Sequence, residues 1–247
     1  MIPPTEGFSS TTVADRSAFQ ILFRPTVELW SWREHPWGVR LRIGIQFTSE
    51  FHDLDDVPGN LRIASFVPGV EVVVPIGDRS LMRPFVDMGV GRITEDRRGP
   101  LFGTGLAAEL VFPAAGFELG LEPQVSYHAA IGPQDGDATA SGLELYGDAR
   151  HPLWFKIGNA QPDAGIYMKQ TLLWSSIAFV SSDGSPVTVD RFFEVGAIFG
   201  FEQRPKILFF KLPTIGIGYR FGQIRGLTIR IGDDRLLRLA DPPRSTP

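Results

Sequence analysis

Three residues close together in the sequence have the types needed for hydrolytic chemistry. Glu122, Ser126 and His128 supply the carboxylate, hydroxyl and imidazole of a hydrolase triad. The surrounding residues alternate between apolar and polar, so all three share one face of a predicted strand. Residues two apart on a strand lie about 6.6 Å apart along it, which predicts no direct bond between Ser126 and His128. We therefore expect no catalytic residues and interpret the three side chains as polar lining.

Other kinds of site have less support. The chain has no cysteine, which excludes disulfides, zinc–thiolate sites, iron–sulfur clusters and cysteine nucleophiles. Its 4 histidines are scattered without ligand spacing, and no helical pattern follows the glycines of Gly216–Gly218. We expect no metal and no cofactor, and the formal net charge of -4 gives no reason to expect nucleic acid as a partner.

The element that carries the three residues is the clearest in the chain. From Phe117 to His128, odd positions are apolar or aromatic and even positions are polar or small, as a two-faced strand requires. The same period of two returns in 37–48, 82–91, 189–201, 207–222 and 227–231, and more weakly in 19–30, 65–76, 101–112, 140–149 and 165–179. The clearest strands run for about 9 to 13 residues, which matches a tilted bilayer crossing.

These segments number about eleven, and bacterial single-chain membrane barrels close with an even number of strands. We therefore expect an all-β fold, a closed antiparallel up-and-down transmembrane β-barrel of about 12 strands, within a range of about 10 to 12. Residues 152–158 are the candidate for the twelfth strand. Residues 1–18 are predicted to form an N-terminal arm or plug, 19–232 the barrel, and 233–247 a polar C-terminal tail.

The alternation assigns side chains to the two faces of the barrel. The inward face is expected to hold a charge network in the lumen, made of Arg40, Arg42, Arg83, Asp87, Glu109, Glu118, Glu122, Asp190, Glu194 and Arg220. Because an unpaired buried charge costs several kcal/mol, such groups must pair inside a narrow barrel. The lipid-facing row is expected to include Phe117, Leu119, Leu121, Val125, Ile215 and Ile217.

Two strands also resemble those of a known class. Arg83–Gly91 reads Arg-Pro-aromatic followed by spaced glycines, and Gly216–Gly222 reads Gly-x-Gly-Tyr-x-Phe-Gly. Both resemble strands of bacterial outer-membrane β-barrel proteins, in particular medium-sized barrels of about 12 strands of the solitary autotransporter type. The resemblance covers roughly residues 19–232 and is one of composition.

The resemblance implies a Gram-negative cell envelope, with outer-membrane lipid and other envelope proteins as partners. No signal peptide precedes the first strand, so this localisation implies that the sequence is the mature chain. Barrels of this class usually end on a strand that closes with Phe, whereas this chain runs on past Ile231 to Pro247. Either an insertion signal then lies internally, near Tyr219–Phe221, or the tail is a later addition.

The expected function is that of a non-enzymatic outer-membrane barrel, either a narrow porin-like pore or a structural part of envelope assembly. One alternative is an outer-membrane lipid hydrolase of the lipid A deacylase or phospholipase kind, with Ser126 as nucleophile. Another is a soluble β-barrel or sandwich that binds a ligand, which requires Phe117, Leu121 and Val125 to face an interior. The direction in which the Phe117–Tyr127 row points separates the soluble fold from the membrane fold.

Overall fold

The structure is a computed structural model that describes nine stretches of the chain: 17–51, 62–92, 98–131, 138–180, 186–201, 206–207, 210–211, 214–222 and 225–232. The regular elements in these stretches are strands. Within them, no helix has the length and apolar character needed to cross a membrane. Most of the predicted arm and tail, residues 1–16 and 233–247, lies outside the described residues, whereas positions 17 and 18 already belong to the first strand.

The strands follow one another along the chain with short gaps between them. They are β1 (Ser17–Arg24), β2 (Thr26–Trp30), β3 (Gly38–Phe51), β4 (Arg62–Gly77), β5 (Ser80–Arg92), β6 (Arg98–Ala114), β7 (Phe117–Ala130), β8 (Ala138–Pro152), β9 (Pro162–Val180), β10 (Pro186–Phe201), β11 (Lys206–Ile207), β12 (Phe210–Lys211), β13 (Thr214–Gly222) and β14 (Gly226–Gly232).

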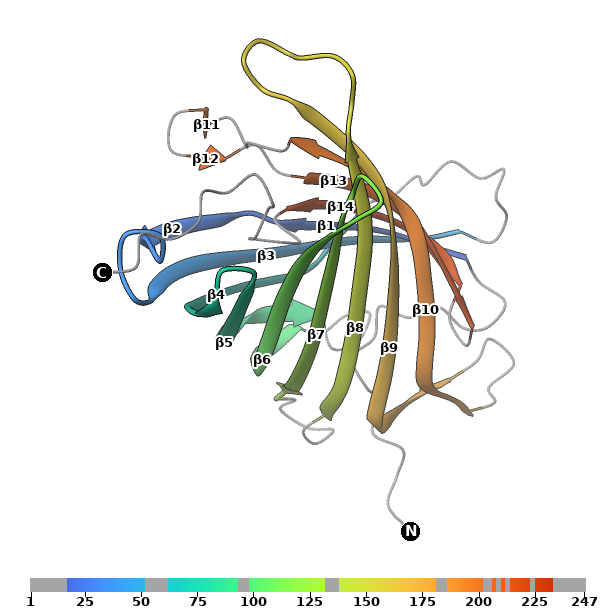
Figure 1. Ribbon diagram of the computed structural model, residues 1–247. Coiled ribbons are helices and arrows are strands. Elements are labelled where there is room, and N and C mark those ends of the chain that lie inside the picture. Colours follow the sequence, from blue (N-terminus) through green and yellow to red (C-terminus); the bar gives the residue numbers. More distant parts are fainter. Residues whose placement is uncertain are drawn as a thin grey trace.

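The strands close into a barrel, which confirms the predicted fold class (Figure 1). From β3 to β10 each strand pairs antiparallel with the next, and β13 and β14 continue the sheet after β10. Strand β1 then pairs with β14 on one side and with β3 on the other, which closes the ring. Pro25 interrupts the first crossing, because it has no N–H for the ladder, and β2 continues along β3 beyond it.

The ring holds 11 strands, with β2 as an extra strand, which lies within the expected range of about 10 to 12 although the ring itself does not have the even number usual in bacterial barrels. Strands in such a meander reverse direction each time, so an odd number makes the first and last run the same way. Strands β1 and β14 are accordingly parallel, over seven residue pairs. Residues 152–158 are not a twelfth strand: β8 ends at Pro152, and the loop that follows contains one isolated bridge, Ile157 to Ala160.

The predicted long strand over 207–222 is also shorter than expected. Its ladder starts at Thr214, and Lys206–Ile207 pairs with Phe210–Lys211 in a separate two-stranded hairpin. Two prolines bracket the change, Pro205 before the hairpin and Pro213 directly before β13. Since proline cannot donate a ladder hydrogen bond, both positions disfavour a continuous strand.

The two rims of the barrel carry different connections. We call the rim with residues 31–37, 78–79, 115–116 and 153–161 the turn rim, and the opposite rim, where β3 ends and β4 begins, the loop rim. The connections at the loop rim lie mostly outside the described residues. Strand β1 starts at the loop rim, since Ser17 pairs with Phe51, and β14 ends at the turn rim, since Gly232 pairs with Thr214.

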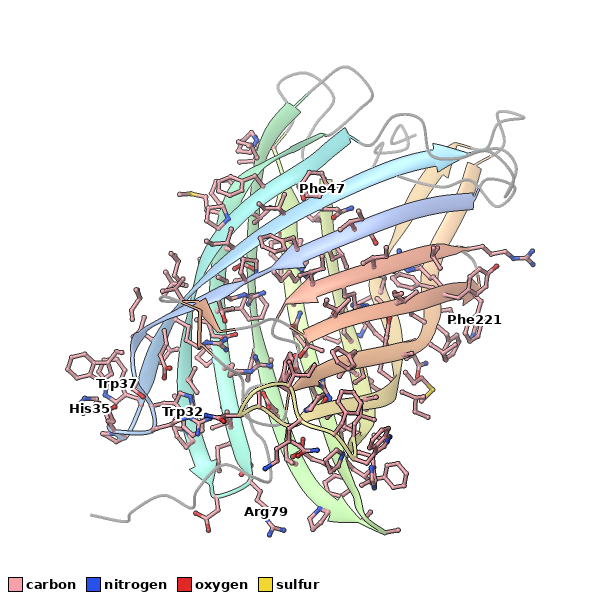
Figure 2. The ribbon with its side chains drawn as sticks, turned by 90° about the horizontal axis from the view of Figure 1, so that it is seen from above. Trp32, His35, Trp37, Phe47, Arg79 and Phe221 are labelled. Carbon is pink, nitrogen blue, oxygen red and sulfur yellow. The ribbon has the colours of Figure 1, made fainter. Side chains whose placement is uncertain are left out.

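Side chains alternate between the two faces as the period of two predicts. On β7, Phe117, Leu121, Val125 and Tyr127 are 45%, 43%, 43% and 47% exposed, whereas Ser126 on the other face is 8% exposed. The apolar row therefore points outward, away from the lumen, and the soluble fold with these residues in a core is wrong. Figure 2 shows Trp37 and Phe221 likewise on the outside of the barrel.

Candidate functional site

The lumen is where the polar side chains of the ring strands meet. Each inward row carries charged residues, and the register brings acids and bases of neighbouring strands side by side. Arg40 on β3 is the ladder partner of Glu71 on β4, for example, and their side chains form an ion pair at 3.0 Å. Both residues are buried, at 4% and 3% exposure. A buried charge is tolerated when it is paired in this way.

One network, the Arg83 network, gathers acids around an arginine. Arg83 on β5 lies 2.5 Å from Glu122, 3.6 Å from Glu71 and 3.7 Å from Glu109, so three strands supply its partners. Arg42 joins it at the edge, 3.9 Å from Glu71 and 3.5 Å from Asp87. Six predicted lumen residues belong to this network: Arg40, Arg42, Arg83, Asp87, Glu109 and Glu122.

A second network, the Glu194 network, has the reverse polarity. The carboxylate of Glu194 on β10 is fully buried and accepts a hydrogen bond from Tyr167 at 2.8 Å. Arg230 donates at 2.8 Å and Arg220 at 3.2 Å. Arg220 also donates to Gln20 on β1 at 3.0 Å, so the network spans the parallel seam between β1 and β14. The predicted lumen residues Glu194 and Arg220 lie here.

Two predicted lumen residues stand apart from these networks. Glu118 is half-buried near the turn rim, where it is the ladder partner of Arg150. The side chain of Asp190 is 55% exposed and lies 3.9 Å from its neighbour Arg191, so it is no part of a buried network. The register with β9 shifts between Val189 and Arg191, and this irregularity breaks the alternation that the sequence prediction relied on.

The predicted lipid-facing residues all lie on the outer face. Phe117, Leu121 and Val125 are exposed, Ile215 and Ile217 are 46% and 55% exposed, and Leu119 is half-buried. Similar exposure recurs on other strands, for example 62% at Val86 on β5 and 69% at Ile166 on β9.

Ser126 and His128 form a hydrogen bond, contrary to the sequence expectation. The imidazole Nε2 lies 3.1 Å from the Ser126 hydroxyl, because the long histidine side chain spans a distance that the backbone spacing alone does not. The other ring nitrogen, Nδ1, faces Gly103, 2.9 Å from where a Cβ there would lie, and not a carboxylate. His128 lines a cavity and Ser126 does not. Among the described residues, the pair therefore has no carboxylate as third triad member, and the Ser126 hydroxyl does not line the cavity.

The sequence missed residues on β9 that complete the charge pairing. Lys169 lies 2.6 Å from Glu144, and Asp163 lies 3.7 Å from Arg150, which is also paired with Asp148. A signal for them exists, because Asp163, Tyr167 and Lys169 fall on alternate positions opposite Ile166 and Met168. Gln170 on the outer row obscures this pattern.

The lumen is filled near the turn rim. Trp32, from the turn that follows β2, packs inside with Val73, Leu81 and Val111, all at most 6% exposed (labelled in Figure 2). On the opposite wall Tyr167 and Ile198, both 3% exposed, pack with Tyr146. We call these two clusters, together with Glu194, the filled region.

Toward the loop rim the lumen is hollow. A cavity of about 460 Å³ lies there, lined by inward residues of strands all around the ring. Its base is formed by members of the Arg83 network, and its sides include Arg24, Gln124, His128, Glu144 and Phe192. This volume is within the range of pockets that hold small molecules, about 300 to 1,000 Å³.

Comparison with protein-family models, with curated protein sequences and with solved structures found no match for this chain. Among the residues that the structure describes, no group of three or more His, Cys, Asp or Glu side chains is placed to hold a metal ion.

Proposed function

We propose that this chain is a non-enzymatic integral β-barrel of the bacterial outer membrane, with a structural or solute-holding lumen and no open pore. The observation that carries the proposal is the outer face, where apolar side chains are 38% to 69% exposed on strand after strand. Soluble monomers rarely expose contiguous apolar patches beyond a few hundred Å². Inside a bilayer such a face contacts lipid chains and is not exposed to water.

The spacing of outward aromatic residues supports a bilayer of the right thickness. On β6, Phe102 and Phe112 lie ten positions apart toward opposite ends of the strand, and so do Phe117 and Tyr127 on β7. Ten residues at about 3.4 Å each, tilted by about 40°, span about 26 Å. The apolar band of membrane barrels is about 25 Å tall and is bordered by aromatic girdles.

The backbone supports the same proposal. In a bilayer core every N–H and C=O must be satisfied within the protein, and a closed barrel achieves this with strands. Most charged side chains of the ring strands are turned into the lumen and stay out of lipid, and many of them pair there. The odd strand number departs from the even number usual in bacterial barrels, but odd-numbered membrane barrels do exist in mitochondria.

The direct test is folding of the full chain from urea into phospholipid vesicles. We expect a folded band that shifts on heating in gel electrophoresis, and aggregation when urea is diluted into plain buffer. A folded, monodisperse monomer in buffer without detergent or lipid would contradict the membrane proposal.

A pair of variants tests whether the cost of a charge on the outer face depends on its depth in the bilayer. Leu121→Arg, near the middle of the outer row of β7, is expected to destabilise the vesicle-folded barrel by about 2–4 kcal/mol. Ala129→Arg, on the same face near the loop rim, is expected to cost about 0–1 kcal/mol, because an arginine there reaches the interface. Equal costs at both positions would argue against a bilayer around this face.

The filled region supports a barrel without an open pore. Val73 and Leu81 are fully buried inside the lumen near the turn rim. In planar bilayers we expect the folded chain to show no steady ion conductance. Stable single-channel currents would instead support the narrow pore.

A further inference from the structure

The cavity in the lumen has mostly paired charges on its walls. Lys169 is paired with Glu144, Arg40 with Glu71, and Arg83 with Glu122, at distances between 2.5 and 3.0 Å. Arg230, at the cavity edge, is held 2.8 Å from Glu194. These cations are neutralised by the protein and offer little to a ligand.

Arg24 is different. It lines the cavity, its side chain is exposed, and within the described part of the chain it forms no ion pair or side-chain hydrogen bond. A guanidinium carries five donors arranged to bind the two oxygens of an acid group. Arg24 therefore presents unused donors to the hollow part of the lumen.

The backbone fixes where Arg24 stands. It is the last residue of β1, directly before Pro25, whose carbonyl accepts a hydrogen bond from the Ile43 N–H at 3.0 Å. Its ladder partner is Gly232, where an added Cβ would lie 2.6 Å from the Arg24 carbonyl oxygen. Neighbouring strands thus hold the backbone at Arg24 in place, and this fixes where its long side chain begins.

From that point Arg24 faces a space that it shares with several walls. The same cavity is lined by Asp87 on β5, His128 on β7, Glu144 on β8 and Lys169 on β9. A ligand held by Arg24 would therefore meet polar and charged side chains of four other strands.

Arg42 supplies a second, loosely held cation beside it. Its closest carboxylates, on Asp87 and Glu71, are 3.5 and 3.9 Å away, and its side chain is 21% exposed. The guanidinium stacks over the ring of Phe85 at 4.2 Å, which orients it.

We propose that the cavity binds a small organic anion whose carboxylate or phosphate is held by Arg24, with Arg42 as the second donor. Charge-assisted bonds of this kind are about twice as strong as neutral ones. The remaining walls suit a ligand with hydroxyl or amino groups, since Gln124 and Glu144 face the same space. The setting of this site rests on the membrane function above, but binding itself requires only the folded barrel.

The test is titration calorimetry of the full, folded chain in uncharged detergent at low salt, with citrate and inorganic phosphate as separate probes. We expect at least one of them to bind, and the one that binds identifies the preferred acid group. Arg24→Ala should raise the dissociation constant at least about tenfold, which corresponds to about 1.4 kcal/mol. Arg24→Lys keeps the positive charge but loses the two-pronged guanidinium, so its dissociation constant should lie between those of the unchanged chain and Arg24→Ala.

The matched control is Arg79→Ala, an exposed arginine in the turn between β4 and β5, away from the cavity (Figure 2). It should bind the probe as the unchanged chain does. Failure of both anions to bind the folded chain, or equal binding by Arg24→Ala, would overturn the site. If the barrel instead folds in plain buffer, the membrane proposal fails, and the same titration there still decides on the site.

Discussion

The filled region and the cavity are two parts of one lumen, built from the same strands, yet their side chains differ in exposure. In the filled region Val73, Leu81 and Glu194 are fully buried. At the cavity the side chain of Glu144 is 28% exposed, and Arg24 is exposed. Strand number alone does not explain the difference, because the ring is the same at both levels.

The difference follows from side-chain size. Barrels of about eight strands are filled by side chains, and barrels of about 16 leave an aqueous channel, so 11 strands allow either outcome. Near the turn rim large side chains fill the space: the turn adds Trp32, and Tyr167 packs over the inward glycines Gly216 and Gly218. Toward the loop rim the inward positions include Ser65, Gly103, Ala140 and Gly142, which leave room. The number of strands thus sets the width of the lumen, and the inward side chains decide which part of the lumen is filled.

The largest expected effect is in the filled region, at Glu194. Glu194→Ala leaves Arg220 and Arg230 buried without their acid, and we expect a loss of about 3–5 kcal/mol in unfolding free energy. The counterpart in the cavity is Glu144→Ala. Lys169 is 8% exposed and also loses its acid, but it lines the cavity and not a filled cluster, so we expect a smaller loss of about 1–3 kcal/mol. Urea unfolding of the vesicle-folded chain measures both. Equal losses would show that the two parts of the lumen do not differ in hydration.

A pair of leucines makes the same comparison for apolar packing. Leu81→Ala opens a void in a fully buried cluster and should cost about 2–5 kcal/mol. Leu173→Ala removes a half-buried side chain that lines the cavity, and it should cost well under half of that. The same unfolding titration checks both variants, and a larger loss at Leu173 would contradict the assignment of filled and hollow parts.

A glycine on the inner face tests how tightly the Glu194 network is packed. A Cβ at Gly218 would lie 2.0 Å from the Tyr167 hydroxyl, so Gly218→Ala should cost about 1–3 kcal/mol. At Gly147 the nearest atom would be 3.8 Å away, and Gly147→Ala should leave stability unchanged or slightly raised. Thermal unfolding in detergent compares the two; a neutral Gly218→Ala would mean that Tyr167 can move aside.

The smallest expected effect is at Ser126. Ser126→Ala removes one hydrogen bond to His128 and should cost about 0.5–1.5 kcal/mol. Because Nδ1 of His128 faces Gly103, we expect no difference from the unchanged chain in hydrolysis of phospholipid or nitrophenyl esters. Ester hydrolysis that is present in the unchanged chain and lost in Ser126→Ala would establish the lipid hydrolase.

The sequence predicted well what depends on local periodicity. The strand from Phe117 and the direction of its row follow from the alternation of side chains, and so do the inward positions of Arg83 and Glu194. Local patterns also gave about eleven strands; the error came from adding a twelfth on grounds of parity. In 152–158 the apolar residues Leu153, Trp154 and Phe155 are consecutive and do not alternate, a pattern that fits a loop better than a two-faced strand.

What the sequence could not predict depends on contacts between distant residues or on side-chain conformation. The closure of β1 onto β14 joins residues that are far apart in the chain. The hydrogen bond between Ser126 and His128 depends on the histidine rotamer, which strand spacing does not fix. The exposure of Asp190 follows from a register shift that shows no local signal.

The parallel seam gives the molecule a polarity that a barrel with an even number of strands lacks. Ser17 opens the ring at the loop rim and Gly232 ends it at the turn rim. If the ring spans a bilayer, eleven crossings amount to one net passage, so tags joined before Ser17 and after Gly232 would report different compartments. With respect to its two flanks the barrel then behaves like a single-pass membrane protein, and its insertion requires one flank to cross the bilayer.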